Sequence, residues 1–539
     1  MSELDPVVVV GSGASGVHFA LTALEKGRRV VMLDVGRRRP EPLGVAETFE
    51  QLKTGVSDPV QFFLGKDYEA LTFPDDDEEY YALAPNQHYV VEPLDRFQLA
   101  TSGFSPLVSF AAGGLGEIWC AGCYPLNDAD LEDYPFTYAD LEPYYETVAR
   151  RIGVTGEADD LTRFYPVQDG LLPPLTLDEH SRVLLETYRM RKTALNGSHG
   201  CYVGRARVAT LSRDLNGRKA CGYLGRCRWG CPNHSIYVPT LTLSECLAHD
   251  RFTYVPDVHV SHFVFGSNNR VRKVVARSVT DDTRLEVDVG ALVLAAGTLS
   301  SSKIFLDAVH RDSGERLTLR GLLDNRQVLM PFVNLGLIGK PFDPESYQYQ
   351  QVVIALDAEH ARDRVYGLVT TLKTALIHPI VASFPTSMRT GLSLFRDIHG
   401  ALAMLNVNFS DRRREENQLS IEVDGNGEST TLRVEYVPEP NESAKIARVT
   451  KRFRRILRKL GCIAPKNATH IRPMGASVHY AGTIPMSTSG SGPTTDEVCR
   501  SRDFDNLYFV DGTTFPSLPA KNLTFTLMAN ATRVADLAF

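Results

Sequence analysis

The chain has 539 residues, of which 43% are hydrophobic and 23% are charged, and its formal net charge is -7. This length predicts two domains or one large composite unit. The acidic balance argues against a nucleic-acid partner, and no apolar run reaches the roughly 18 residues of a membrane span. The first apolar run begins at Val7, leaving no room for a signal peptide, and nine cysteines without compact spacing indicate reduced thiols. A cytoplasmic location is therefore expected.

A glycine-rich turn follows the first predicted strand. Four valines at 7–10 suit a parallel strand that is buried on both faces. The glycines that follow, Gly11, Gly13 and Gly16, have the spacing of the dinucleotide-binding fingerprint. In that motif the first glycine permits a tight turn, the second lets a pyrophosphate approach the backbone, and the third lets the helix pack against the strand. The alternative is a glycine-rich turn that binds no ligand.

The helix and strand after this turn fall where a nucleotide site requires them. The helix is predicted from Ala14 and Ser15 to about residue 26, with its N-terminus directed at the phosphates and Gly27 at its end. The next strand ends at Asp34, a carboxylate placed for a ribose hydroxyl. Together these elements predict a Rossmann-type α/β domain.

The middle of the chain contains a second glycine-rich segment and several clear elements. Gly113 and Gly114 either let the backbone approach a flat or charged ligand or belong to a plain loop. Residues 137–153 predict an amphipathic helix with a threonine N-cap. Residues 252–289 alternate as strands around a turn at 267–269. A buried strand then ends at Ala296 and Gly297, and a helix follows it.

The second half of the chain changes pattern and then returns to nucleotide-binding features. Residues 316–440 alternate between apolar and polar positions, which predicts a largely antiparallel substrate domain. A basic amphipathic helix is predicted over 444–460, with its arginines on a solvated face. Near the C-terminus, a strand ends in Asp511 and Gly512, where the ribityl and pyrophosphate groups of a flavin nucleotide would lie.

In this order, the motifs resemble those of the glucose–methanol–choline (GMC) oxidoreductases. The match includes the H-x-x-G-T segment that begins at His479, and residues 519–524 before a C-terminal helix over 525–536. The resemblance implies an α/β fold with a Rossmann-type, glutathione-reductase-like FAD-binding domain and a second α+β substrate domain built on an antiparallel sheet. We expect the discontinuous FAD-binding domain to comprise residues 1–130, 205–315 and 465–539, and the substrate-binding domain to comprise 131–204 and 316–464.

The resemblance also implies a reaction and a set of site residues. An FAD-dependent enzyme would oxidise an alcohol (CH–OH) group by hydride transfer to flavin N5, with His479 as base and Asn522 as ligand of the alcohol oxygen. A neutral imidazole accepts a proton near pH 7, and an amide can steady the developing charge. The alternatives are a loop or core histidine and an ordinary helix N-cap. The cofactor-binding residues expected are Gly11, Gly13, Ala14, Ser15, Gly16, Asp34, Gly113, Gly114, Val258, Ala296, Gly297, Asp511, Gly512 and Thr524.

Two segments bear on the cofactors. Some family members bond the flavin covalently through a histidine in the glycine loop; here Ile118 stands at that position, so non-covalent FAD is expected. The cysteines Cys221, Cys227 and Cys231 resemble a spacing in family sugar dehydrogenases that carry a three-iron four-sulfur cluster. They are either structural thiols or ligands of such a cluster. In both cases the neighbouring arginines, 226 and 228, should favour the thiolate form.

We expect the substrate to be a small-molecule alcohol, namely a sugar or glycoside. This expectation rests on the resemblance of the cysteine loop and on tyrosines 347, 349 and 366 in the substrate segment. The alternatives are a sterol or long-chain alcohol oxidase or dehydrogenase, and a redox-neutral flavin lyase on the same fold. Either oxygen or an electron-acceptor protein would reoxidise the flavin.

Overall fold

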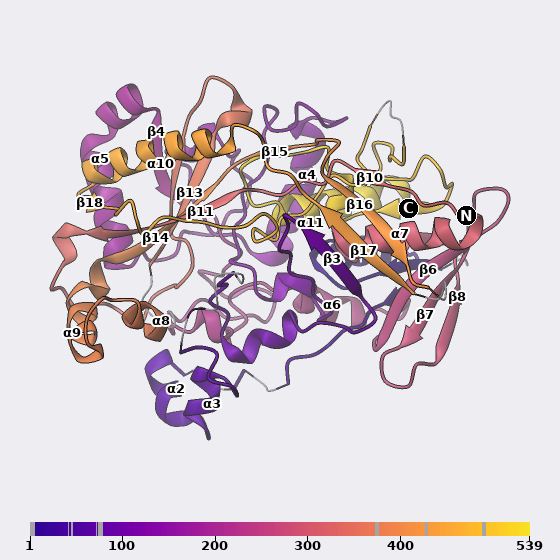
Figure 1. Cartoon of the computed structure of the whole chain (residues 1–539), viewed down its shortest axis with the longest axis horizontal. Coiled ribbons are helices and arrows are strands. Elements are labelled where there is room, and N and C mark those ends of the chain that lie inside the picture. The colour runs from indigo at the N-terminus through magenta and orange to yellow at the C-terminus, as the bar shows by residue number, and fades with distance from the viewer. Residues whose placement is uncertain are drawn as a thin grey trace.

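The structure is a computed structural model that describes residues 6–40, 43–44, 47–71, 73, 79–371, 377–425, 429–487 and 492–539. The molecule is elongated, with a large antiparallel sheet (β11, β13 and β14) toward one end and both chain termini toward the other (Figure 1). This arrangement confirms the predicted α/β class with a second, antiparallel sheet.

A parallel sheet in the order β20-β9-β1-β2-β5 forms the first half of the fold. Its strands are β1 (Val7–Val10), β2 (Val30–Leu33), β5 (Phe252–Val255), β9 (Ala291–Leu294) and β20 (Leu507–Phe509). Val7 pairs with both Val30 and Ala291, so the strands end together at one edge. The run of valines is fully buried, as predicted, because both faces of this sheet are covered.

Different elements cover the two faces of this sheet. Val7 and Val9 pack with helices, whereas Val8 and Val10 pack with one helix and a small antiparallel sheet. The helices on the first face are α1 (Ala14–Glu25), α4 (Tyr138–Ile152), α6 (Pro239–Leu247) and α11 (Thr524–Ala538). The second face carries α7 (Thr298–Ser313), β6 (Val258–Phe265), β7 (Val271–Ser278) and β8 (Arg284–Asp288).

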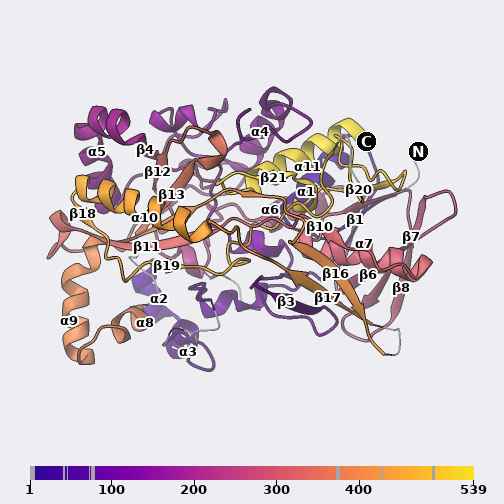
Figure 2. The same ribbon diagram turned by 45° about the horizontal axis from the view of Figure 1, so that its top comes forward.

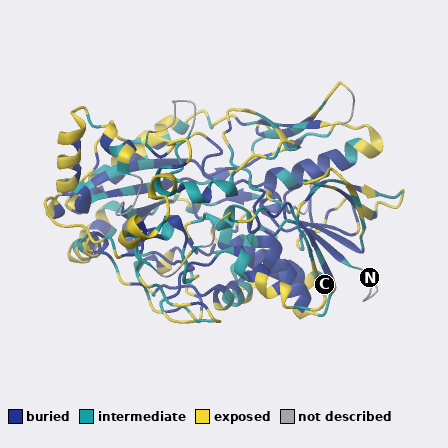
Figure 3. Ribbon diagram, turned by 90° about the horizontal axis from the view of Figure 1, so that it is seen from below, coloured by how far each residue is buried: buried dark blue, intermediate teal, exposed yellow. Residues whose placement is uncertain are grey.

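The C-terminal helix closes this half of the molecule onto its beginning. Figure 2 shows α11 beside α1, and the ring of Phe539 meets that of Phe19 edge to face. Figure 3 shows the helix beside the C-terminus largely buried.

Two helices end at the signals read from the sequence. Thr137 and Asp140 form a capping box at the start of α4, and Gly153, with a φ of 72°, follows its last residue. Gly27, with a φ of 79°, follows the C-cap of α1. Both boundaries confirm the predictions because capping residues, unlike interior ones, act through local geometry alone.

The large antiparallel sheet forms the second half, in the order β18-β11-β14-β13-β12-β4, with β19 also paired to β11. Its strands are β4 (Cys201–Arg205), β11 (Gln327–Asn334), β12 (Val352–Leu356), β13 (Val365–Thr371), β14 (Leu402–Asn408), β18 (Cys462–Ile463) and β19 (His470–Ile471). One face packs against α5 (Glu179–His199) and the predicted basic helix α10 (Glu442–Lys459). Part of the opposite face, including Val353, Ala355 and Tyr366, packs into the core beneath the first half of the fold.

A smaller sheet joins distant segments, in the order β10-β16-β17-β3. It contains β3 (Gln98–Ser102), β10 (Leu319–Arg320), β16 (Gln418–Val423) and β17 (Thr430–Glu435), while β15 (Asp411–Arg412) pairs with β21 (Ser517–Leu518). The other α-helices of the described residues are α2 (Phe49–Gly55), α3 (Pro59–Leu64), α8 (Ile377–Ala382) and α9 (Met388–Ile398). The boundaries of the two expected domains stay a prediction. Helix α4 lies in the range 131–204 expected for the substrate domain, and it packs with α11, which lies in the range 465–539 expected for the FAD-binding domain.

Among the helices of the described ranges, none combines the length and the apolar character that crossing a bilayer requires.

Candidate functional site

A cavity of about 1380 Å³ lies between the carboxyl edge of the parallel sheet and the face of the large antiparallel sheet that points away from α5 and α10. Ligands of open α/β sheets bind at this edge. The predicted site residues on the cavity wall are Gly11, Gly13, Ala14, Ser15, Asp34, Gly113, Gly114, Val258, Ala296, Gly297, His479, Asp511, Gly512, Asn522 and Thr524. Gly16 and the three loop cysteines do not line it. Segments that are hundreds of residues apart in the sequence are thus brought together.

The three fingerprint glycines sit in three different environments. Gly11 has a φ of 99°, a backbone conformation that side chains rarely adopt. A Cβ at Gly16 would collide with the carbonyl oxygen of Gly11, so this glycine brings helix and strand together. A Cβ at Gly13 would meet no atom of the described residues closer than 4.0 Å and would instead fill the cavity. This pattern fits a backbone that a pyrophosphate approaches at Gly13.

Ser12 joins the first glycine turn, the second glycine segment and Asp34. Its hydroxyl accepts a hydrogen bond from the Gly113 amide at 3.0 Å and donates one to the Asp34 carboxylate. Tyr254 also donates to Asp34, at 3.2 Å. Burial raises the pKa of Asp34 to about 6, although these hydrogen bonds act in the opposite direction. Sequence reasoning missed Ser12, although it lies within the glycine motif.

Asp511 fixes the strand ends on the other side of β1. Its carboxylate accepts hydrogen bonds from the Gly297 amide at 3.0 Å, the Ser301 hydroxyl at 2.5 Å and the Thr513 amide at 3.1 Å. Burial raises the pKa of this carboxyl. At Gly297 a Cβ would meet nothing within 4 Å in the part of the chain that the structure describes, which again leaves room for a ligand.

His479 is held in one tautomer by a residue that the sequence did not indicate. Its Nδ1 lies 3.0 Å from Oδ1 of Asn325. The Asn325 amide nitrogen donates to the carbonyls of Phe409 at 2.7 Å and Pro519 at 3.1 Å, which directs its oxygen to the ring. Because an amide oxygen only accepts, Nδ1 carries the proton and Nε2 carries a lone pair.

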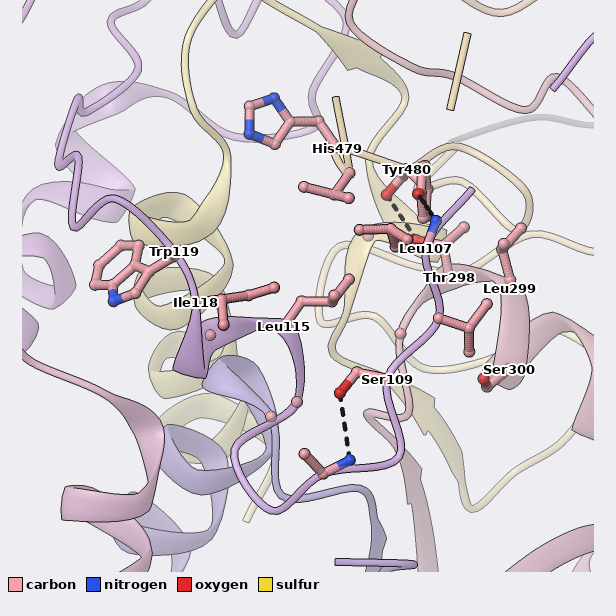
Figure 4. A pocket seen from close by; sticks show the side chains of 18 of the residues that line it. Leu107, Ser109, Leu115, Ile118, Trp119, Thr298, Leu299, Ser300, His479 and Tyr480 are labelled. Atoms are coloured by element: carbon pink, nitrogen blue, oxygen red, sulfur yellow. Dashed lines mark hydrogen bonds between the residues drawn. The ribbon is translucent and has the colours of Figure 1, made fainter. Parts of the chain in front are cut away.

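The environment of His479 keeps its ring neutral. Burial lowers the pKa of the imidazole to about 4, and the positive charge of Arg472 acts in the same direction. Figure 4 shows His479 on the cavity wall together with Ile118 and Trp119 of the glycine segment. Such a ring can accept a proton at neutral pH.

Asn522 does not cap the last helix. Leu523 occupies the N-cap of α11, and Oδ1 of Asn522 is buried without a hydrogen-bond partner among the described residues. A buried amide oxygen without a partner is costly and indicates that a bound ligand supplies one. The preceding Lys521 is fully buried and donates to the carbonyls of Pro125 at 2.9 Å and Phe164 at 2.7 Å.

One face of the large antiparallel sheet forms the far wall of the cavity. Alternation along the strands points Leu329, Thr370, Met404 and Asn406 into the cavity, while their neighbours pack under α5 and α10. The tyrosines used above to favour a sugar, at 347, 349 and 366, are buried and do not line the cavity. The predicted substrate role of these three tyrosines is wrong, because all three pack into the hydrophobic core beside the cavity.

The cysteine loop gives no support to an iron–sulfur cluster. Cys221, Cys227 and Cys231 are free thiols, and across the described ranges no three His, Cys, Asp or Glu side chains are grouped so that they could hold a metal ion. Burial raises the pKa of the Cys221 thiol to about 11 and also raises that of Cys227. Desolvation therefore outweighs the expected effect of the neighbouring arginines on these two thiols.

Comparisons with known proteins show which family and which fold this chain resembles. A family model described as "GMC oxidoreductase" matches residues 413–531. Paromamine 6'-oxidase of Streptomyces fradiae is 24% identical over 98% of this chain and 90% of its own length. The 2-methyl-1,2-propanediol dehydrogenase of Mycolicibacterium austroafricanum is 20% identical over 98% and 94%. The crystal structure of pyridoxine 4-oxidase from Mesorbium loti superimposes with a TM-score of 0.59 at 16% identity, covering 99% and 98% of the two chains.

Proposed function

This chain is a GMC oxidoreductase, and from that premise we propose that it oxidises a hydroxyl group of a sugar or glycoside with FAD as cofactor and His479 as base. One observation carries the proposal. A neutral imidazole with its lone pair on Nε2 and an amide whose oxygen has no partner among the described residues share a cavity with the glycine turn of a nucleotide site. Base, oxygen ligand and cofactor site are the parts that alcohol oxidation requires.

The cavity wall suits FAD in its shape and in its chemistry. Gly11, Gly13 and the N-terminus of α1 would hold the pyrophosphate, because helix N-termini bind anions. Asp34 would bind a ribose, and the backbone at Gly297 leaves space for the cofactor. Ile118 has no group that could bond covalently to a flavin, which supports dissociable FAD.

The reaction removes a proton from the hydroxyl oxygen and a hydride from its carbon, which leaves a carbonyl. His479 Nε2 takes the proton, and Asn325 keeps the ring in the tautomer that can do so. The amide nitrogen of Asn522 donates a hydrogen bond to the alcohol oxygen and steadies its developing charge, and its unpaired Oδ1 can accept a hydrogen bond from a further hydroxyl of the substrate. FAD, when bound, supplies the acceptor of the hydride.

A polar substrate is favoured over a sterol or a long-chain alcohol. Asn406 and Tyr80 line the cavity. Oδ1 of Asn406 and the hydroxyl of Tyr80 are buried and have no hydrogen-bond partner among the described residues. A polyhydroxylated molecule can bond to such groups, whereas an apolar one leaves them unpaired. The similarity of this chain to paromamine 6'-oxidase supports this preference.

An absorption spectrum during anaerobic titration tests the function. The purified protein should show flavin absorption bands at roughly 370 and 450 nm. Sugars or glycosides should bleach these bands under anaerobic conditions. A yellow protein that turns over its substrate without net flavin reduction would be a redox-neutral lyase. Reduction by sterols or long-chain alcohols but not by sugars would exclude the proposed substrate class. Oxygen consumption on turnover then separates oxygen from an electron-acceptor protein as the oxidant.

The lowered pKa of His479 predicts a shifted pH profile. Because the neutral ring is the active form, kcat/KM should stay level down to about pH 5 and should fall only near the ring's pKa of about 4. An ordinary histidine would lose activity near its usual pKa of about 6.5. Rapid-mixing measurement of anaerobic flavin reduction from pH 4 to 9 distinguishes the two. An acid limb centred near 6.5 would argue against a desolvated base.

A further inference from the structure

The cysteine loop places an arginine on the cavity wall. Arg228 lies in the short helix η4 (Cys227–Trp229), whose Trp229 is fully buried against the rings of Phe49 and Phe63. The Arg228 Nη1 donates to the carbonyl of Ala82 at 3.2 Å. Within the described part of the chain it forms no ion pair with a carboxylate. A firmly anchored backbone thus presents a guanidinium with most of its donors unused.

Every described carboxylate on the cavity wall is already bonded within the protein. The pairs are Asp34 with Ser12 and Tyr254, Glu79 with His470 and Arg472, Asp307 with Lys303 and Thr430, and Asp511 with Ser301 and Thr513. The Glu79 carboxylate contacts both of its partners, and only 3% of its side chain is exposed. It is therefore unable to receive a cationic substrate. The described wall offers an unpaired cation and no unpaired anion.

Arg228 stands at the substrate end of the cavity rather than at the pyrophosphate. The carbonyl of Cys227, the residue before Arg228, accepts a hydrogen bond from the Tyr349 hydroxyl at 3.3 Å, and Gln350, the residue after this tyrosine, donates to the carbonyl of Cys120 at 2.7 Å. Cys120 follows Trp119, which lies with His479 on the cavity wall (Figure 4). The guanidinium of Arg228 therefore lies near the part of the cavity in which His479 would act as base.

We infer that the substrate carries an anionic group, a carboxylate or a phosphate, which binds to Arg228. The inference rests on the proposed function, since it names the class of alcohol that the same site oxidises. A guanidinium recognises both anions through paired N–H donors, and it repels an ammonium group. Sugar acids and sugar phosphates combine such a group with hydroxyls that can reach His479.

Binding measurements on the holoenzyme test the inference. We would titrate it by calorimetry with glucuronate, glucose 6-phosphate, methyl glucoside and glucosamine. At least one of the two anions should bind about tenfold or more tightly than methyl glucoside, and glucosamine should bind more weakly. Added salt should reduce the preference. Binding of glucuronate alone would identify a carboxylate site, and binding of the phosphate alone would identify a phosphate site.

Substitution at position 228 assigns the preference to this side chain. Arg228→Gln should bring the affinities for anionic and neutral sugars close together, whereas Arg191→Gln, on the exposed surface of α5, should keep the parental preference. Equal affinities in the parent, or an unchanged preference in Arg228→Gln, would overturn the inference. If neutral sugars bleach the flavin while the anions do not bind, the inference fails and the proposed function stands. A flavin that no alcohol reduces would overturn both.

Discussion

Replacing His479 with alanine is expected to slow anaerobic flavin reduction by substrate by about 10²–10⁴-fold while FAD stays bound. The imidazole is the neutral base on the cavity wall, and its Nε2 has no partner among the described residues. Without it, the hydroxyl proton has no acceptor as the hydride departs. The glycine turn and Asp34 do not contact His479, so the flavin absorption should persist. Rapid mixing under anaerobic conditions measures the rate.

A second histidine provides the control for this substitution. His360 is exposed and lies away from the cavity wall, so His360→Ala should reduce flavin at the parental rate. If His479→Ala also retains the parental rate with its flavin bound, His479 is not the base. Loss of the flavin spectrum in His479→Ala would instead make its role structural.

The nucleotide half of the fold could be predicted because its signals are local. The valines at 7–10, the glycine spacing and the capping residues of α4 act over a few residues each. The meeting of the ends of β1, β9 and β20 followed from the family resemblance, whereas the order of these strands was not predicted. By contrast, the parallel pairing of β3 with β17 joins segments more than 300 residues apart, and no periodicity in either segment indicates it.

The helices α5 and α9 were missed for two other reasons. The α5 helix carries charged and polar residues on most of its surface, so few apolar positions mark its buried side. The α9 helix lies inside a region whose strands dominate the pattern. Asn325, which orients the base, could not be found from sequence because its role depends on carbonyl groups from two distant segments. Asn522 and His479, which both line the cavity, could be predicted as candidates because each belongs to a motif.

Replacing Lys521 with methionine is expected to cost about 3–5 kcal/mol of folding free energy. The ammonium group is fully buried and pairs with Asp130, which is also buried, besides donating to two carbonyls. Methionine fills similar volume but leaves a buried carboxylate without its counter-charge. The midpoint of thermal unfolding of the holoenzyme should fall by several degrees. Because Lys521 precedes Asn522, the rate of flavin reduction should fall as well.

The charge left behind, rather than the lost packing, should account for most of this cost. In a Lys521→Met/Asp130→Asn double variant the buried charge is gone, and the asparagine oxygen can still accept the hydrogen bond that the Asn127 amide donates at 2.9 Å. The double variant should therefore unfold at a higher temperature than Lys521→Met alone. The single variant should also lose less stability relative to the parent at pH 5 than at pH 8, because an unpaired buried carboxylate has a raised pKa and destabilises the fold only while it is ionised. A double variant no more stable than the single one would place the cost in the two carbonyls that lose their donor.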